Sequence, residues 1–246
     1  IVQASLLPNI KFIEGKTIQQ QQLQTLMRIR ELAVKQKTAT KNQTKALLLE
    51  FNIRVSNRNG GLSTTIQNLL EDAENGFTAY FRATIKTVFE TYLQICTAIK
   101  EYDYSIEKAI RTTSECKRLI RLEGVGPINA INLYLAIGCS DSTVFTQGRD
   151  VSACIGLTPV QHSSGGKTKL GGISKTVRNR IMRSQLVTGA FTFVNSIAKK
   201  EAKTEKEVWL KNLIERRGKK CAAVALANKT VRTAFAMLTK ETEYKV

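Results

Sequence analysis

The sequence predicts a mainly α-helical protein, with a long helical hairpin followed by a second helical domain. Only three prolines interrupt the 246 residues, and helix-forming residues such as Leu, Ala, Lys, Gln and Glu dominate most of the chain. The length is also sufficient for one or two domains with a buried core.

The first long helix is expected from Thr17 to about Phe51, where apolar residues recur at helical spacing. Thr17 is a suitable N-cap because its hydroxyl oxygen can accept a bond from a free backbone N–H of the first turn. The stretch SNRNGG at residues 56–61 should end this region. A short helix is then expected from Ser63 through Asp72.

A second long helical region is expected from Phe77 to Arg121. Six steps between apolar positions cover the 21 residues from Ile85 to Ile106, an average of 3.5, which is the period of a coiled-coil seam. A helical hairpin or a dimerising coiled coil fits this pattern. An ordinary amphipathic helix packed inside one domain fits it equally well, and both interpretations stay open.

The charge predicts a polyanionic partner. The net charge is +18 with a pI near 9.9, and contacts between basic side chains and phosphates release condensed counterions. Residues 1–120 hold 17 basic and 11 acidic side chains, net +6, and residues 121–246 hold 21 and 9, net +12. Residues 160–200 contain eight basic side chains and no acid. A solvated surface is the alternative, but interleaved glycines favour phosphate contact.

Composition excludes several other classes. The five cysteines are odd in number and form no CxxC pair, which argues against a disulfide framework or a zinc ribbon and fits a reducing compartment. No uncharged apolar run approaches the roughly 18 residues that a membrane-spanning helix needs. We expect a cytoplasmic protein without membrane contact. Because the chain opens abruptly in apolar sequence at Ile1, we also expect its natural beginning to be missing.

A glycine-rich turn is the first candidate site. A helix is expected to end at Gly124, with a tight turn through Val125 and Gly126 and a new helix beginning at Pro127. Gly-apolar-Gly between two helices resembles the helix-hairpin-helix motif, in which the free N–H groups of the second helix face a DNA phosphate. The alternative is a structural turn with a glycine cap.

The second candidate is a glycine-rich stretch from Gly156 to Arg180. Its Gly-Gly-Lys-Thr sequence invites comparison with a P-loop, but Gln161 stands where that motif requires glycine, and no Walker B sequence follows. A serine-hydrolase elbow is also excluded by the residues around Ser163 and Ser164. Neither a nucleotide-binding loop nor a hydrolase is therefore expected.

Two hydroxyls in a cationic loop remain, Ser163 and Ser164. Nearby cations could neutralise a phosphodiester, and a serine placed there could attack phosphorus if a partner activated it. The single histidine, His162, is adjacent in sequence but is more often incidental in such a loop. From the chemistry alone, a phosphate-binding loop is favoured over a catalytic one. Its candidate nucleic-acid-binding residues are Gly165, Gly166, Lys167, Lys169, Lys175, Arg178, Arg180 and Arg183.

The residues from LEGVGPINAINLYLAIG through SSGGKTKLGGISKTVRNRIMR, followed by ERRGKKCAAVALANKTVRTAFAMLT, resemble a known family. They are similar to the C-terminal domain of insertion-sequence transposases of the "one-hundred-and-ten" type, which includes the Piv DNA invertases. Residues 10–53 resemble the central helical region of the same family. This resemblance divides the chain into the tail of a truncated RuvC-like domain (1–16), a helical coiled-coil region (17–116) and a C-terminal transposase domain (117–246).

The resemblance implies a bacterial or archaeal DNA transposase or site-specific recombinase. It implies an N-terminal RuvC-like domain whose four acids bind Mg²⁺, oligomerisation through the helical region, and often a structured noncoding guide RNA. The family's nucleophilic serine falls on Ser164, with Ser163 as the adjacent candidate. Ser164 would attack the scissile phosphate to give a phosphoserine-linked DNA.

The front of the chain departs from the family pattern. Its first acid is Glu14, and Glu31 and Glu50 are better interpreted as surface residues of the first long helix. No metal ligands are therefore expected in this chain, and the fragment alone is expected to be inactive in cleavage. The chain is either an excerpt of a longer protein or a decayed element. Two alternatives to a recombinase stay open: a DNA- or RNA-binding module without chemistry, and a purely structural oligomerisation device.

Overall fold

The structure is a computed structural model that describes residues 15–56, 61–138, 145–177, 179–240 and 244. Most of the expected RuvC-like tail, at residues 1–14, lies outside the described residues, as do Arg178 and Cys139. Contacts divide the chain into two compact units. The helical-hairpin unit comprises Leu23–Ile106, and the C-terminal unit comprises Glu107–Val246 with the start of the chain through Gln22.

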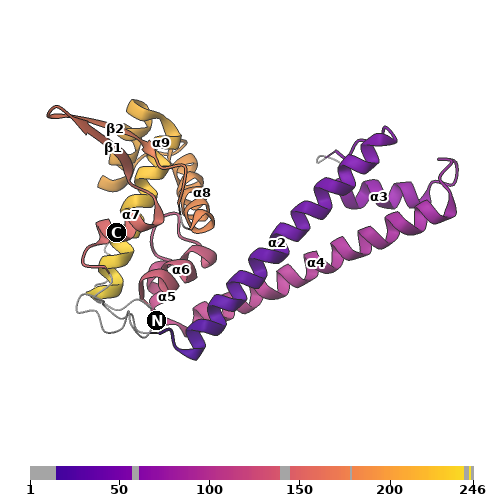
Figure 1. The fold of residues 1–246 in the computed structure, drawn as a ribbon, viewed down its shortest axis with the longest axis horizontal. Coiled ribbons are helices and arrows are strands. Elements are labelled where there is room, and N and C mark those ends of the chain that lie inside the picture. The colour runs from indigo at the N-terminus through magenta and orange to yellow at the C-terminus, as the bar shows by residue number, and fades with distance from the viewer. Residues whose placement is uncertain (1–14, 57–60, 139–144, 178, 241–243, 245–246) are drawn as a thin grey trace. The chain divides into compact units, whose positions relative to one another are not determined.

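The mainly α-helical prediction is confirmed (Figure 1). Its elements in chain order are α2 (Ile18–Glu50), α3 (Gly61–Glu71), α4 (Ala79–Thr112), α5 (Ser114–Leu119), α6 (Pro127–Leu133), the π-helical turn η1 (Tyr134–Gly138), α7 (Gly148–Ile155), β1 (Pro159–Ser164), β2 (Lys167–Ile173), α8 (Arg180–Ile197) and α9 (Glu205–Thr239).

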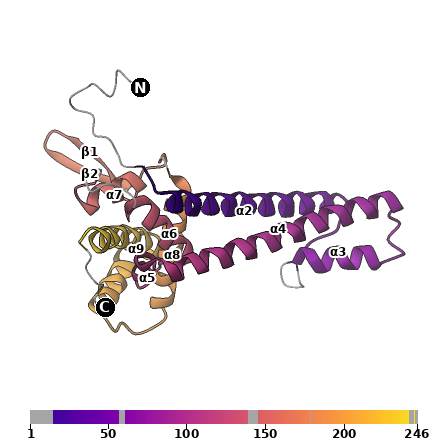
Figure 2. The same ribbon diagram turned by 90° about the horizontal axis from the view of Figure 1, so that it is seen from below.

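Helices α2 and α4 run antiparallel within the helical-hairpin unit, as both Figure 1 and Figure 2 show. A small core joins them to α3, and its largest fully buried side chains are Leu48 and Ile66. Phe51, Phe77 and Phe81 form a cluster beside this core, with ring centroids 4.8–5.3 Å apart. The helical hairpin is therefore present, whereas dimerisation through it stays a prediction.

The apolar period predicted for the second long helix matches the buried face of α4. Ile85, Phe89, Ile99 and Ile106 are all buried on it. The helical region expected from Phe77 to Arg121 consists of two helices, because the chain breaks at Thr113 and continues as the short helix α5. The expected start of α2 is confirmed, because the Thr17 hydroxyl accepts a bond from the Gln20 N–H at 3.3 Å.

One ion pair links the polar middle of α2 to α4. The Arg30 Nε donates to Asp103 Oδ1 at 2.8 Å, and its Nη2 donates to Oδ2 at 3.5 Å. Both side chains are partly exposed, at 21% and 42%, so the pair adds only modestly to the stability of the helical hairpin. Its two hydrogen bonds favour one alignment of α2 against α4.

The C-terminal unit has one continuous core. Helix α9 lies along it and contacts α7 and α8, and its buried face consists mainly of small residues, including Ala222, Ala223, Ala227 and Ala234. Small side chains let the neighbouring helices approach closely. Gly218, at φ 79°, breaks α9 into two segments, because only glycine adopts this left-handed conformation without strain.

The predicted domain boundary between residues 116 and 117 falls inside α5. The boundary between the two compact units lies after Ile106 instead, and the functional division at 116 stays a prediction. Within the described part of the chain, no helix is both long and apolar enough to cross a membrane. The cysteines described there, Cys96, Cys116, Cys154 and Cys221, form no disulfide bond.

Candidate nucleic-acid interface

The serine–glycine stretch forms a β-hairpin rather than the loop that the sequence suggested. Strands β1 and β2 are antiparallel, and Ser164 pairs with Lys167 across the turn. The two turn residues, Gly165 and Gly166, have φ angles of 56° and 75°. Two consecutive left-handed residues define the turn type whose twist matches a two-residue hairpin, and a Gly-Gly pair adopts it without steric cost.

The register assigns the two serines to opposite faces of the hairpin. Side chains alternate along a strand, and directly paired residues share a face. The face that we call the cationic face therefore carries His162, Ser164, Lys167 and Lys169. The other face carries Gln161, Ser163, Thr168 and Leu170, where the Gln161 Nε2 donates to Ser163 Oγ at 2.8 Å.

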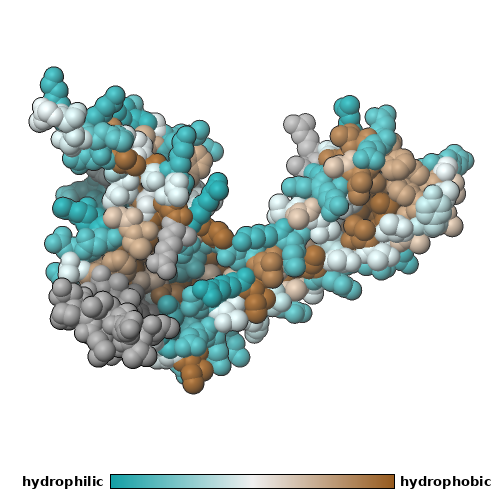
Figure 3. Space-filling model, in the orientation of Figure 1, coloured by the Kyte–Doolittle hydropathy of each residue, from teal (hydrophilic) through white to brown (hydrophobic). Residues whose placement is uncertain are grey.

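Every residue of β1 and β2 except the half-buried Ile173 is exposed. In Figure 3 the end of the hairpin, at the upper left, consists of hydrophilic and neutral residues. An isolated two-stranded hairpin is only marginally stable in water, because it has no second layer to bury an apolar face. Its position must therefore be fixed from its base.

Two side chains from distant elements hold that base. The Asn228 Nδ2 of α9 donates to the Leu157 carbonyl at 3.1 Å, just before β1. The Arg183 guanidinium of α8 donates to the carbonyls of Ser174, just after β2, and of Gly156. Both ends of the hairpin are thus hydrogen-bonded to helices of the core.

The remaining cations predicted for this site are not gathered at one point. Lys175 follows β2, and Arg180 begins α8; both are exposed. Arg183 is half-buried, and its guanidinium donates to backbone carbonyls, so it positions the hairpin. Arg178 lies outside the described residues.

The glycine turn has a different geometry from the one expected. The preceding helix ends at Leu119 rather than at Gly124, because residues 120–124 form turns, and α6 begins at Pro127 as predicted. Gly124 packs against α8: a Cβ on it would lie 2.9 Å from the Ala190 backbone. Val125 is buried, whereas Gly126 is exposed with no atom within 4 Å of an added Cβ. Among Gly124, Val125 and Gly126, only Gly126 is exposed.

A cluster of three polar side chains links this turn to α9 and to Tyr244 near the end of the chain. Lys206 is paired with Glu123, and the Tyr244 hydroxyl donates to Glu123 Oε1 at 2.7 Å. Burial raises the pKa of Glu123, but the hydrogen bonds from Lys206 and Tyr244 outweigh it and hold that pKa below its usual value. The pKa of Tyr244 is raised by burial and by its bond to Glu123.

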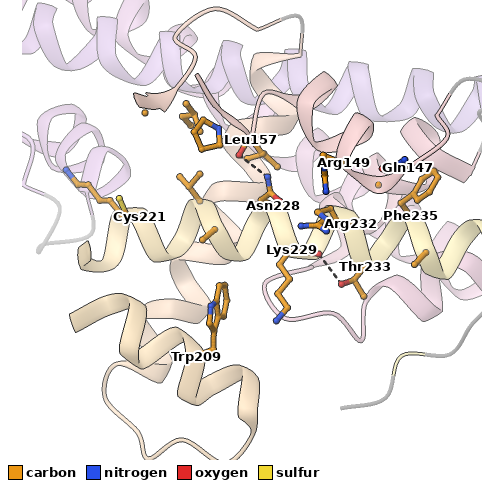
Figure 4. Close-up of a pocket in the computed structure, with 18 of the residues that line it drawn as sticks. Gln147, Arg149, Leu157, Trp209, Cys221, Asn228, Lys229, Arg232, Thr233 and Phe235 are labelled. Atoms are coloured by element: carbon orange, nitrogen blue, oxygen red, sulfur yellow. Dashed lines mark hydrogen bonds between the residues drawn. The ribbon is translucent and has the colours of Figure 1, made fainter. Parts of the chain in front are cut away.

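A groove of about 1170 Å³ runs along the exposed side of the second segment of α9, from the hairpin base to the start of α7. Figure 4 shows Asn228 and Arg232 on the side of α9 that faces Leu157 and Arg149, and Lys229 on the side of Trp209. The Lys229 ammonium lies 4.7 Å from the centre of the Trp209 ring. The sequence reasoning missed this site, because the residues that line it come from separate stretches of the chain, such as Arg149, Trp209 and Arg232.

Among the described residues, no group of three or more His, Cys, Asp or Glu side chains could hold a metal ion. The described residues therefore offer no set of ligands that fits Mg²⁺. What the geometry offers is hydroxyl, imidazole and ammonium groups on one exposed face.

These features define a class: a basic, mainly helical protein whose exposed hairpin and open groove suit an extended, phosphate-bearing partner better than an enclosed small molecule. Comparison with known proteins narrows the class. Residues 116–206, which contain the hairpin, match the profile described as "Transposase IS116/IS110/IS902 family".

Relatives extend the match to the whole chain. The transposase for insertion sequence element IS1111A of Coxiella burnetii is 34% identical over 245 residues, covering 100% of this chain and 66% of the relative. A probable family 20 transposase of Pseudomonas aeruginosa is 31% identical, covering 100% and 71%. The transposase for IS1328 of Yersinia enterocolitica is 28% identical, covering 99% and 71%.

The chain therefore belongs to the IS116/IS110/IS902 transposase family, and the family predicted from the sequence is confirmed. It spans about two-thirds of the length of these relatives.

Proposed function

We propose that this chain is the DNA-binding and nucleophile-bearing part of a DNA transposase, with Ser164 as the nucleophile. The observation that carries the proposal is the register of the hairpin. It sets Ser164 on the same face as Lys167 and Lys169, whereas Ser163 faces away from them. Family membership supports transposition as the activity of the whole protein.

The cationic face suits attack on a phosphodiester. Two ammonium groups can neutralise the charge that accumulates on the non-bridging oxygens as the Ser164 oxygen approaches phosphorus. A new Oγ–P bond forms and one bridging P–O bond breaks, so the DNA hydroxyl leaves with a proton, while the serine proton passes to a base. The covalent product preserves the energy of the phosphodiester for a later rejoining step.

The exposure of Ser164 also limits what the chain does alone. A serine hydroxyl is a weak nucleophile without an activating base or metal, and the described residues form no metal site. We propose that this chain binds DNA by itself but cleaves it only within a longer parent, in which acids outside this chain hold Mg²⁺.

Two further partners belong to the same proposal. A structured noncoding RNA would guide the protein to its DNA, since the chain's large positive charge is not specific for either nucleic acid. The parent would also form a homo-oligomer through the helical-hairpin unit. Exposed apolar side chains on α2 and α4 favour this: Ile29, Leu32, Leu47, Leu49, Leu93 and Tyr104. Sedimentation of the chain as a monomer would count against oligomerisation.

Covalent capture tests the nucleophile. In a full-length transposase that contains this chain, Ser164→Ala should abolish the protein–DNA adduct, and Ser163→Ala should retain it. The two variants are matched, because each removes one exposed hydroxyl from the same strand. An adduct formed by Ser164→Ala would disprove the assignment. Loss of chemistry in every form of the parent, with DNA binding intact, would favour the non-catalytic nucleic-acid-binding module.

A further inference from the structure

We propose that the groove along α9 holds an unpaired DNA strand beside the hairpin. This inference rests on the proposed function, because attack by Ser164 breaks one strand and leaves a free end that must be retained until rejoining. The groove is a separate feature from the hairpin tip and is formed mainly by α9 and the start of α7, with the base of the hairpin at its edge.

The charge of the groove selects a polyanion. Five cationic side chains line it, and none of the described residues that line it is acidic: Arg149, Lys220, Lys229, Arg232 and Lys240 are the cations. All five are exposed. Five cations along one groove match a partner with repeated negative charges better than a single small anion.

The apolar and aromatic side chains of the groove favour binding of an unpaired DNA strand over a duplex. Apolar and aromatic side chains line the groove together with the cations, among them Ile173, Trp209, Val224 and Phe235. In a duplex the faces of the bases are stacked on one another and cannot reach these side chains. An unpaired strand presents base faces on one side and phosphates on the other, and this pairing of stacking surface with cations is typical of single-strand binding.

The position of the groove fits a strand that leaves the cleavage point. Its edge includes Pro159, Gly171 and Gly172 at the base of the hairpin, and Ser164 lies at the tip. Five residue steps of about 3.3 Å place the tip roughly 17 Å from the base. At about 3.4 Å per nucleotide step this is no more than roughly five nucleotides, and an unpaired strand stretches further.

Glycines at this edge keep the path open. Gly172 has no atom within 4 Å of an added Cβ, so the backbone at this edge of the groove is open. On the opposite side, Gly148 packs against the Arg232 backbone, with an added Cβ only 3.1 Å from it, and so holds the start of α7 close to α9.

The chain contains its own probe, because Trp209 is its single tryptophan. An oligothymidylate of twelve nucleotides should change the fluorescence emission of Trp209, because its phosphates would bind the Lys229 ammonium that lies over the indole ring. A blunt duplex of equal length should bind without this change. Apparent affinity should fall with salt, with a slope of about −0.7 per phosphate contacted.

Arg232→Gln tests the cationic wall. It should weaken oligothymidylate binding about fivefold and reduce the salt slope by about 0.7. Lys100→Gln is the matched control, since it removes one exposed charge from α4 in the other compact unit and should leave both quantities unchanged. Circular dichroism should show equal helix content in all three proteins.

Several results would overturn the proposal. These are equal affinities for the Arg232 and Lys100 variants, oligothymidylate bound by anisotropy without any Trp209 response, tighter binding of oligouridylate than of oligothymidylate, or an equal response to polyglutamate. The last two would assign the groove to RNA or to an acidic protein segment. None depends on Ser164, so a failed covalent capture with an intact Trp209 response would reject the nucleophile and retain the groove.

Discussion

Replacing Gly124 by alanine should destabilise the C-terminal unit, whereas the same change at Gly126 should not. The two glycines lie in one turn and were assigned one DNA-binding role from the sequence, but the structure separates them. Gly124 has φ 75°, and a Cβ on it would lie 2.9 Å from the backbone N and Cα of Ala190 and from the carbonyl oxygen of Gly189. Gly126 is extended, with φ −95°, and is open to solvent.

The cost at Gly124 has two parts. A left-handed alanine costs about 1–2 kcal/mol, and forcing a methyl group against helix backbone costs about 1–3 kcal/mol, since backbone cannot rotate away as a side chain would. The more restricted unfolded chain returns about 0.4–1 kcal/mol. The net destabilisation is about 2–4 kcal/mol, which lowers the Tm of a unit of this size by about 5–15 °C.

Thermal unfolding followed by circular dichroism at 222 nm measures the difference. Gly124→Ala should melt about 5–15 °C below the parent chain, and Gly126→Ala within about 2 °C of it. DNA affinity should be measured on the same proteins at a temperature where both are folded. Equal melting of Gly124→Ala and the parent would refute the packing argument. Unchanged DNA affinity in Gly126→Ala would remove the phosphate role from this turn.

Three further predictions concern parts around the hairpin and the turn. Because the pKa of Glu123 is lowered in the folded state, its stabilising contribution should be lost as pH falls through that pKa, and Tyr244→Phe should reduce the acid sensitivity of the Tm between pH 7 and 3. Gly166→Val should unfold the hairpin tip and speed tryptic cleavage there, because valine does not adopt the left-handed φ of this position. Asparagine does adopt a left-handed φ, so Gly165→Asn should leave the digestion rate unchanged. Arg183→Met should speed tryptic cleavage at the hairpin while far-ultraviolet circular dichroism stays the same, and equal digestion would show that its carbonyl bonds do not hold the base.

The long helices could be predicted from sequence because their stability comes from a local periodic pattern. The apolar spacing from Ile85 to Ile106 identified the buried face of α4 before any tertiary contact was known. Element ends were less accurate, since Thr113 interrupts a pattern whose period continues past it. The glycines at 124 and 126 were recognised as a turn, but their separate environments depend on α8, which lies some 60 residues further along.

The hairpin and the groove could not be predicted in the same way. Strands β1 and β2 bury no apolar face, so the alternation that normally identifies strands is absent; Leu170, for example, is 65% exposed. The hairpin depends on two left-handed glycines and on anchors from Arg183 and Asn228. A Gly-Gly pair between short polar segments was the one local signal available.

The geometry of the turn has a consequence for the chemistry. Because side chains alternate along a strand, a slip of one residue would move Ser163 to the cationic face and turn Ser164 away from it. No buried face penalises such a slip here, since both faces of the hairpin are solvated. The register must therefore be set by the Gly165–Gly166 turn and by the hydrogen-bonded base. Under the proposed mechanism the two glycines determine which serine faces the lysines, and a variant that lacks one of them should pair Ser163 with Lys167 and transfer adduct formation from Ser164 to Ser163.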